Sequence, residues 1–146
     1  MDVEKTVNEA ISLLTDLHEV EVVNDCQGLT VLADSLMRQL FHNLIDNSLR
    51  HGEKVSRIRV YYEEMEKNKL KLVYEDDGVG ITTADKANLF KEGYGKNTGY
   101  GLYLIRKMCE VYGWTISETG KQGEGVQFTI TIPKINEGGK EIYHLR

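Results

Sequence analysis

The sequence contains little of what marks several classes of protein. Of its 146 residues one is proline and two are cysteine, and Cys26 and Cys109 lie far apart and form no metal-type or redox pair. No run approaches the roughly 18 apolar residues of a membrane helix, and no charged-then-apolar leader resembles a signal peptide. Acidic residues outnumber basic ones by 23 to 18, which argues against non-specific nucleic-acid binding. We therefore expect a cytoplasmic domain without direct nucleic-acid or membrane contacts.

What the sequence does contain is typical of one folded domain. Hydrophobic residues make up 40% and charged residues 28% of the chain, as in soluble globular proteins. A chain of 146 residues suits a single domain with a sizeable core. The 14 glycines are unevenly spread and concentrate at residues 78–80, 93–101, 120–125 and 138–139. These clusters indicate where the chain turns tightly or approaches a ligand closely.

The hydrophobic periodicity predicts an alternation of helices and strands. Helices are expected at residues 7–17, about 35–50, 82–90 and 102–113, with Asp34 or Ser35 capping the second and Thr83 the third. Strands are expected at 20–25 and 29–34, joined by a turn, and as hairpins at 56–66 with 69–76 and at 114–120 with 125–133. This order predicts an α+β fold, a two-layer α/β sandwich with helices on one face of a mixed, mainly antiparallel sheet. We expect one domain over 1–146, with a core at about 20–133 and a partly ordered C-terminal appendage at 134–146.

The second predicted helix carries two asparagines in an otherwise well-patterned stretch, QLFHNLIDNSLRHG. Its leucine-rich ridge must pack on the sheet, whereas Asn43, Asn47 and Arg50 recur at i, i+4 and i+7 and share another face. An asparagine carbonyl is a suitable ligand for Mg²⁺ whose other partners are waters and phosphates, and Arg50 could neutralise phosphate charge. The alternative is that both asparagines are solvated or bonded to neighbouring loops.

The stretch YEDDGVGI places an acid at the end of an apolar strand. Asp76 could accept the exocyclic amine of adenine, and Gly78 and Gly80 would let the chain approach a planar ligand without Cβ obstruction. The alternative is an ordinary glycine turn with solvated acids.

The stretch KNTGYGLYLIRK is a glycine-rich loop that leads directly into a helix. The backbone N–H groups of residues 98–102 would be free at the helix N-terminus, where the helix dipole favours phosphate. The motif is neither a Walker A loop nor a Rossmann fingerprint. The motif is weak evidence for a phosphate site by itself, and it gains support because it follows the two earlier motifs in order.

Together these stretches resemble the ATP-binding catalytic domain of sensor histidine kinases, within the GHKL group of gyrase, heat-shock chaperone, histidine kinase and MutL. FHNLIDNSLRHG is similar to the N box, DDGVGI to the first glycine box, LFKEGYG to the F box and TGYGL to the second glycine box. The match covers about residues 20–133 and implies a Bergerat fold that holds ATP and Mg²⁺ under a mobile lid. By position, it implies a Mg²⁺ site at Asn47 and Asn43, phosphate contacts from Arg50, Lys96, Thr98, Gly99, Tyr100, Gly101 and Leu102, and an adenine pocket of His51, Asp76, Gly78, Gly80 and Ile81. Asn43 and Arg50 are the catalytic candidates.

The sequence departs from the family pattern at three places. The lid at residues 91–98 is short, and Val126 stands where the family often has a threonine that contacts the adenine region. No histidine lies in a pattern typical of a dimerisation helix, so the resemblance implies that the phosphoacceptor is on another segment.

The resemblance also sets the expected reaction and its competitors. Asn43 stands where hydrolysing members carry a glutamate and cannot act as a base, so we expect slow ATP hydrolysis. We expect transfer to a histidine of a separate dimerisation domain and relay to a response regulator, in a larger sensor that could be membrane-bound. Two other hypotheses remain, namely a serine kinase of the anti-sigma-factor type and a non-catalytic nucleotide-binding module.

Overall fold

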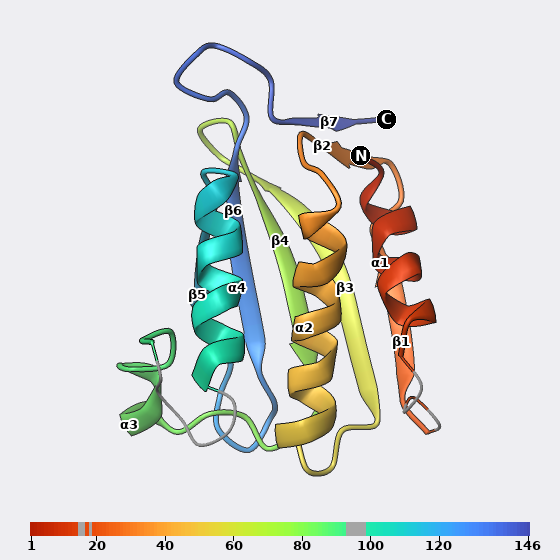
Figure 1. Ribbon diagram of the computed structural model, residues 1–146, viewed down its shortest axis with the longest axis vertical. Coiled ribbons are helices and arrows are strands. Elements are labelled where there is room, and N and C mark those ends of the chain that lie inside the picture. Colours follow the sequence, from red (N-terminus) through yellow and green to blue (C-terminus); the bar gives the residue numbers. More distant parts are fainter. Residues whose placement is uncertain (15–16, 18, 93–98) are drawn as a thin grey trace.

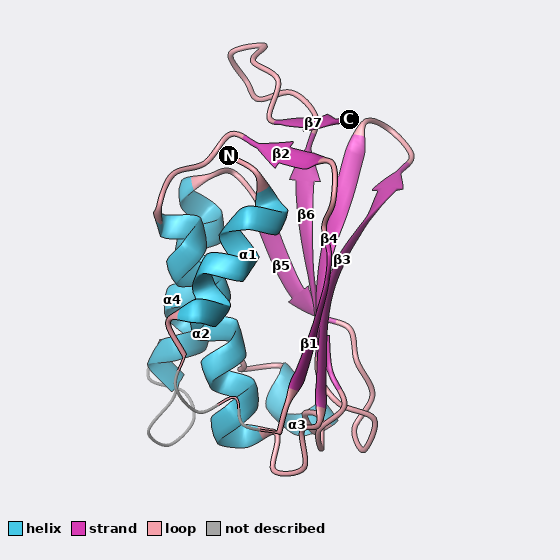
Figure 2. Ribbon diagram, turned by 90° about the vertical axis from the view of Figure 1, so that its right-hand side faces the viewer, coloured by secondary structure: helices cyan, strands magenta, loops and turns pink. Residues whose placement is uncertain are grey.

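The structure has two layers, with α-helices on one face of a five-stranded sheet (Figure 2). The computed structural model describes residues 1–14, 17, 19–92 and 99–146, without the side chains of 99–101. The helices are α1 (Val3–Ser12), α2 (Leu36–His51), α3 (Thr83–Lys86) and α4 (Gly99–Val111). The strands are β1 (Glu21–Asp25), β2 (Leu29–Val31), β3 (Arg57–Met65), β4 (Lys69–Asp76), β5 (Thr115–Glu118), β6 (Gln127–Pro133) and β7 (Tyr143–Leu145). The predicted fold class is confirmed.

The main sheet has the strand order β1-β3-β4-β6-β5. β1 is parallel to β3, and every other neighbouring pair is antiparallel. The β3–β4 hairpin turns through Lys67 and Asn68, whose φ angles of 62° and 57° are left-handed, as tight hairpin turns between twisted strands require. Along β6 burial alternates, with Phe128, Ile130 and Ile132 buried. One face of the sheet therefore packs against the helices and the other faces outward.

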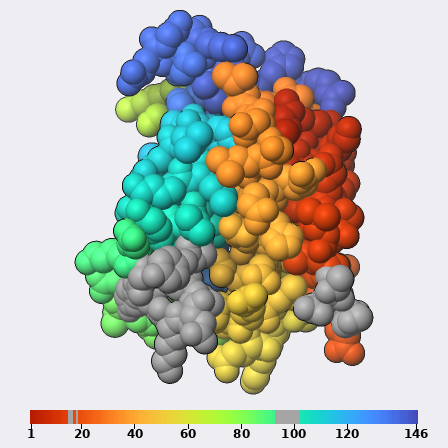
Figure 3. All heavy atoms as spheres, in the orientation of Figure 1, coloured from red at the N-terminus to blue at the C-terminus, as the bar shows by residue number. Residues whose placement is uncertain are grey.

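The helix α2 is the middle helix of the covering layer, with α1 and α4 on either side of it (Figure 3). Its predicted ridge is fully buried apart from Leu36, which is half-buried. The buried members are Met37, Leu40, Phe41, Leu44 and Ile45, each 0% exposed. Burying a large apolar side chain contributes about 1.5–3 kcal/mol, so the ridge holds α2 against the sheet and determines where its other face points.

Of the first three helix starts, two differ from the sequence-based expectation and one agrees with it. The first helix begins at Val3 rather than at residue 7 because Asp2 is its N-cap, with its carboxylate accepting the Lys5 N–H at 3.2 Å. Asp34 accepts the Leu36 N–H at 3.1 Å, whereas Ser35 makes no cap hydrogen bond. Thr82, not Thr83, caps α3 through the Asp85 N–H. No described helix has both the length and the apolar character that a membrane crossing requires.

The two ends of the chain meet at the end of the molecule opposite α3 (Figure 1). β2 pairs with β7 in an antiparallel two-stranded sheet, and Ile142 and Tyr143 are each 5% exposed. The end of the expected C-terminal appendage is therefore packed into the fold, whereas residues 135–141 are exposed. The turn-linked strands β1 and β2 also separate into different sheets. Both differences have one cause. A three-residue strand forms only where a partner strand from a distant part of the sequence pairs with it, and a local sequence pattern does not show that partner.

The two cysteines lie in the core, and we expect both thiols to be unreactive in the folded protein. Cys26 and Cys109 are free and buried, and burial raises the pKa of each thiol to about 12. Thiolate is the reactive form, so Ellman's reagent at pH 8 should label fewer than about one chain in twenty in minutes, and both thiols after unfolding in guanidinium. A Cys26→Ala control should leave one thiol in denaturant, and fast native labelling would contradict the expectation.

The same raised pKa values predict how stability changes at alkaline pH. Unfolded thiols ionise above about pH 8.5, whereas the folded thiols keep their protons until about pH 12. The thiols' contribution to stability is therefore fully present below pH 8.5 and is lost as the pH rises towards 12.

Candidate functional site

Three of the predicted segments meet at one end of the molecule. The C-terminal end of α2, the N-terminal end of α4 and the end of β4 all lie at the end that also carries α3 (Figure 1). The loop after β4 is attached directly to the end of α2, because the Val79 N–H donates to the Gly52 carbonyl at 3.1 Å. The fold therefore brings the N-box helix and the first glycine box into contact.

Asp76, the last residue of β4, is the best-defined group of this site. Its residue is 7% exposed, and its Oδ1 accepts the N–H groups of Gly78 at 3.0 Å and Val126 at 3.1 Å. Its Oδ2 accepts the hydroxyl of Ser48 at 2.6 Å. These three donors offset the cost of burying a carboxylate. Since a carboxylate offers about four acceptor positions, about one is left for an N–H donor of a ligand.

The glycines around Asp76 make close backbone contacts that no other residue would permit. A Cβ atom on Gly78 would lie 2.6 Å from the Gly52 carbonyl oxygen, and one on Gly80 would lie 2.8 Å from the Lys121 carbonyl oxygen. At Gly125, where φ is +111°, a Cβ atom would lie 1.9 Å from the carbonyl oxygen of Asp76. The sequence indicated Gly78 and Gly80 as base-contacting residues. The structure shows that both let the loop pack on its neighbours, and contact with a base stays a prediction.

Sequence reasoning missed Ser48 and Tyr74. The Tyr74 hydroxyl lies 2.6 Å from Ser48 Oγ, and both residues are buried. Burial raises the pKa of Tyr74, so its hydroxyl stays protonated. Strand alternation places residues 74 and 76 on one face, which could have identified Tyr74. No pattern in the helix connects Ser48 with residue 76.

The two asparagines of α2 differ in their surroundings. Asn43 Oδ1 accepts the Gln39 side-chain amide at 2.9 Å. Asn47 Nδ2 is buried and has no hydrogen-bond partner among the residues that the structure describes. The nitrogen and oxygen of an amide exchange places by a half-turn, so Asn47 can present its oxygen in the same position. A buried amide nitrogen with no partner among residues 1–14, 17, 19–92 and 99–146 fits a Mg²⁺ site in which most ligands would come from phosphate and water.

The remaining predicted site residues are less buried than Asp76. Arg50 is exposed and forms an ion pair with Asp46 at 3.1 Å within α2, so its charge has a protein partner besides a phosphate. His51 is exposed at the last position of α2. Ile81 and Leu102 are half-buried and pack against the main core.

The second glycine box is described only in part. Lys96 and Thr98 lie outside the described residues. Gly99, Tyr100 and Gly101 form the first turn of α4, and their side chains lie outside the description. The helix therefore begins where the sequence predicted free N–H groups for a phosphate, and the individual contacts stay predictions.

An ion pair connects α3 with the end of β5. Glu118, whose side chain is 2% exposed, lies 2.9 Å from Lys86 Nζ, and its Oε2 accepts the N–H groups of Gly120 and Gln127. Lys86 also donates to the Gly120 carbonyl. This pair, together with the Gly123 N–H bonded to the Val79 carbonyl at 2.7 Å, holds the β5–β6 turn against the loop after Asp76.

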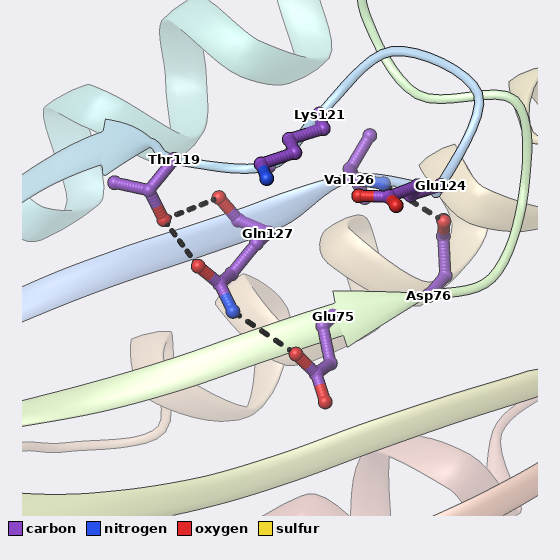
Figure 4. Close-up of a pocket in the computed structure, with 9 residues that line it drawn as sticks. Glu75, Asp76, Thr119, Lys121, Glu124, Val126 and Gln127 are labelled. Atoms are coloured by element: carbon purple, nitrogen blue, oxygen red, sulfur yellow. Dashed lines mark hydrogen bonds between the residues drawn. The ribbon is translucent and has the colours of Figure 1, made fainter.

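The outward face of the sheet carries a separate polar hollow beside this turn. Gln127 links Glu75 and Thr119 by hydrogen bonds of 3.0 Å and 2.7 Å, as Figure 4 shows. Because Asp76 points toward α2, strand alternation puts Glu75 on the other face. Within the described residues, this hollow of about 260 Å³ contains Asp76 but none of the other predicted site residues. It therefore adds nothing to the site.

Comparisons with known proteins agree with this arrangement. Residues 33–136 match the family described as histidine kinase-, DNA gyrase B-, and HSP90-like ATPase. The adaptive-response sensory kinase SasA of Prochlorococcus marinus is 31% identical over 144 residues, which cover 88% of this chain and 38% of that protein. A probable C4-dicarboxylate sensor kinase of Bacillus subtilis is 32% identical over 106 residues, which cover 67% and 20%. The chain thus spans less than two fifths of the length of these relatives.

Solved structures share the fold. The catalytic domain of the histidine kinase ThkA superposes with a TM-score of 0.76 at 24% identity and covers 92% of this chain and 93% of that one. The histidine kinase AdeS of Acinetobacter baumannii superposes with a TM-score of 0.73 at 26% identity and covers 93% and 66%. The family match spans more than half of the sequence. The chain therefore belongs to the family of histidine kinase-, DNA gyrase B- and HSP90-like ATPases.

Proposed function

We propose that this chain is the ATP-binding catalytic domain of a two-component sensor histidine kinase and that it acts in the cytoplasm. It binds ATP and donates the γ-phosphoryl group to a histidine of a separate dimerisation domain, from which a response regulator receives it. The observation that carries the proposal is Asp76, a buried carboxylate with three protein donors and about one acceptor position left. The two curated relatives named above are both sensor kinases, which supports the same function.

The metal of this proposal is Mg²⁺. Asn47 would hold it, with Asn43 assisting, and the observation that fits is the buried Nδ2 of Asn47, which has no hydrogen-bond partner within the described part of the chain. The described residues contain no group of three histidine, cysteine or acidic side chains that could hold a metal. A Mg²⁺ ion held by Asn47 would take its other donors mostly from phosphates and water, as Mg²⁺ prefers. When bound, Mg²⁺ neutralises negative charge on the phosphates during transfer.

The chain's own residues would position the nucleotide and exclude a competing reaction. Asp76 orients the base, and the first turn of α4 favours phosphate through the helix dipole. A nitrogen lone pair of the acceptor histidine then forms the P–N bond. The bond from the γ-phosphorus to the bridging oxygen breaks, and ADP leaves with that electron pair. Asn43 cannot take a proton from water, and its oxygen is bonded to Gln39, which supports slow hydrolysis.

Two measurements test the function. Calorimetry should show Mg²⁺-dependent binding of ATP, with GTP at least about tenfold weaker because its 6-oxo group cannot donate to Asp76. Incubation with γ-labelled ATP and a histidine-bearing dimerisation fragment should then give acid-labile phosphohistidine. Acid-stable phosphoserine on a partner would favour the anti-sigma-factor type of kinase. Nucleotide binding without transfer to any partner would favour a non-catalytic module.

A further inference from the structure

A buried chain of hydrogen bonds leads from Tyr74 through Ser48 to Asp76. Tyr74 is 1% exposed and Ser48 is 4% exposed. The Tyr74 hydroxyl lies 2.6 Å from Ser48 Oγ, which lies 2.6 Å from Asp76 Oδ2. None of the family motifs quoted above assigns a role to either hydroxyl.

We propose that Ser48 and Tyr74 are positioning residues that hold the Asp76 carboxylate in one orientation and so set the preference for a 6-aminopurine. The proposal deepens the nucleotide site proposed above and rests on it. Ser48 would act on Asp76 directly, and Tyr74 would act only through Ser48.

The order of the protons follows from the chemistry of the three groups. A serine hydroxyl has one proton, and here that proton is directed to Asp76 Oδ2. Ser48 Oγ must then accept from Tyr74, whose hydroxyl stays protonated because burial raises its pKa. The hydrogen bonds therefore all point from Tyr74 towards Asp76, and each hydrogen bond strengthens the next.

The hydrogen bonds from Tyr74 through Ser48 to Asp76 determine which acceptor position of Asp76 is left open. Backbone N–H groups of Gly78 and Val126 occupy Oδ1, which fixes one end of the carboxylate. Ser48 occupies one position of Oδ2 and prevents rotation of the other end. A ligand's amine then meets an acceptor already in place. A purine without the amine leaves that acceptor unpaired, which is the costly case for a buried polar group.

Each of the two hydroxyls can be removed by a substitution that keeps most of the side chain's packing. The Tyr74 ring lies 6.3 Å from the ring of Phe128, a contact that Tyr74→Phe would keep. Ser48→Ala alone would leave the Tyr74 hydroxyl buried without its partner, at a cost in stability. The double variant removes both polar groups and so avoids that cost.

The test compares ATP with purine riboside triphosphate, which lacks only the 6-amino group, by calorimetry on the whole chain. We expect the wild-type preference for ATP to fall about tenfold in Ser48→Ala, which loses one hydrogen bond to a charged group. In Tyr74→Phe we expect a fall of about threefold, because the lost hydrogen bond is to the neutral Ser48 hydroxyl. Affinity for the purine analogue should change less than about twofold. Tyr62→Phe is the matched control. Tyr62 lies on β3, the strand beside β4, and the substitution removes a tyrosine hydroxyl that donates to the Gln27 carbonyl at 2.6 Å.

The double variant tests whether Tyr74 acts through Ser48. Its preference for ATP should equal that of Ser48→Ala, because Tyr74 has nothing left to act on. Additive losses, or an unchanged preference in Ser48→Ala and in the double variant, would overturn the proposal while the ATP site stands. A wild-type chain that does not bind ATP would overturn the proposed function together with this inference.

Discussion

Replacing Asn47 by alanine should reduce Mg²⁺-dependent ATP binding by more than about a hundredfold, because a metal that neutralises phosphate charge contributes several kcal/mol. The same change should slightly stabilise the folded protein. Asn47 Nδ2 is buried without a partner in the described structure, and alanine is the better helix former. We expect a gain of about 0.5–1 kcal/mol, hence a Tm about 2 °C higher. Calorimetry with Mg²⁺ or with EDTA, and thermal unfolding, measure both effects.

Asn8→Ala is the matched control for this variant. Asn8 is an exposed asparagine on the neighbouring helix α1, and it accepts one hydrogen bond from Asn24 at 2.9 Å. Its loss should leave nucleotide binding unchanged. If Asn47→Ala binds ATP with unaltered Mg²⁺ dependence, the metal assignment is wrong. If the variant loses stability, the buried amide has a partner within the protein.

Replacing Gly125 by alanine should destabilise the protein by about 3–5 kcal/mol. The new Cβ atom would lie 1.9 Å from the Asp76 carbonyl oxygen, at a φ of +111° that side chains rarely adopt. Relief requires the β5–β6 turn to move away from β4. That movement would break both hydrogen bonds between Val126 and Asp76, so ATP affinity should fall as well. Urea unfolding, followed by the fluorescence of the single tryptophan, Trp114, measures the stability.

Gly123→Ala separates backbone strain from steric contact. Gly123 is in the same turn and also has a positive φ, +89°, but a Cβ atom there meets nothing within 4 Å. We expect a loss of only about 1–2 kcal/mol, the ordinary cost of a left-handed residue. Equal losses in the two variants would show that the close approach to Asp76 does not constrain the turn.

Much of the candidate site could be predicted from the sequence, because its motifs are local. The periodicity of α2 separates the buried ridge around Leu40 and Leu44 from the face of Asn43 and Asn47. The apolar strand ending at Asp76 and the helix beginning at Gly99 likewise follow from short patterns. Such patterns suffice where a feature depends on neighbours within one or two turns of the chain.

Other parts of the site depend on distant partners and could not be predicted in the same way. Ser48 matters because of residue 76, and Gly125 because of the backbone of the same distant residue. Arg50 carries a charge suited to phosphate, yet in the structure it pairs with Asp46. The type of a residue limits which interactions its side chain can form, and the surroundings of that side chain determine which partner it binds.

The sequence by itself determined the order of elements from α1 to β6, the buried ridge of α2 and the location of three motifs, because these follow from spacing along the chain. Only the tertiary structure decided that residues 143–145 pair with β2, and that Tyr74 reaches Asp76 through Ser48. The physical reason is the same for both. A short strand and a buried hydroxyl each need a hydrogen-bond partner, and the partner is chosen by how the layers pack rather than by its position in the chain.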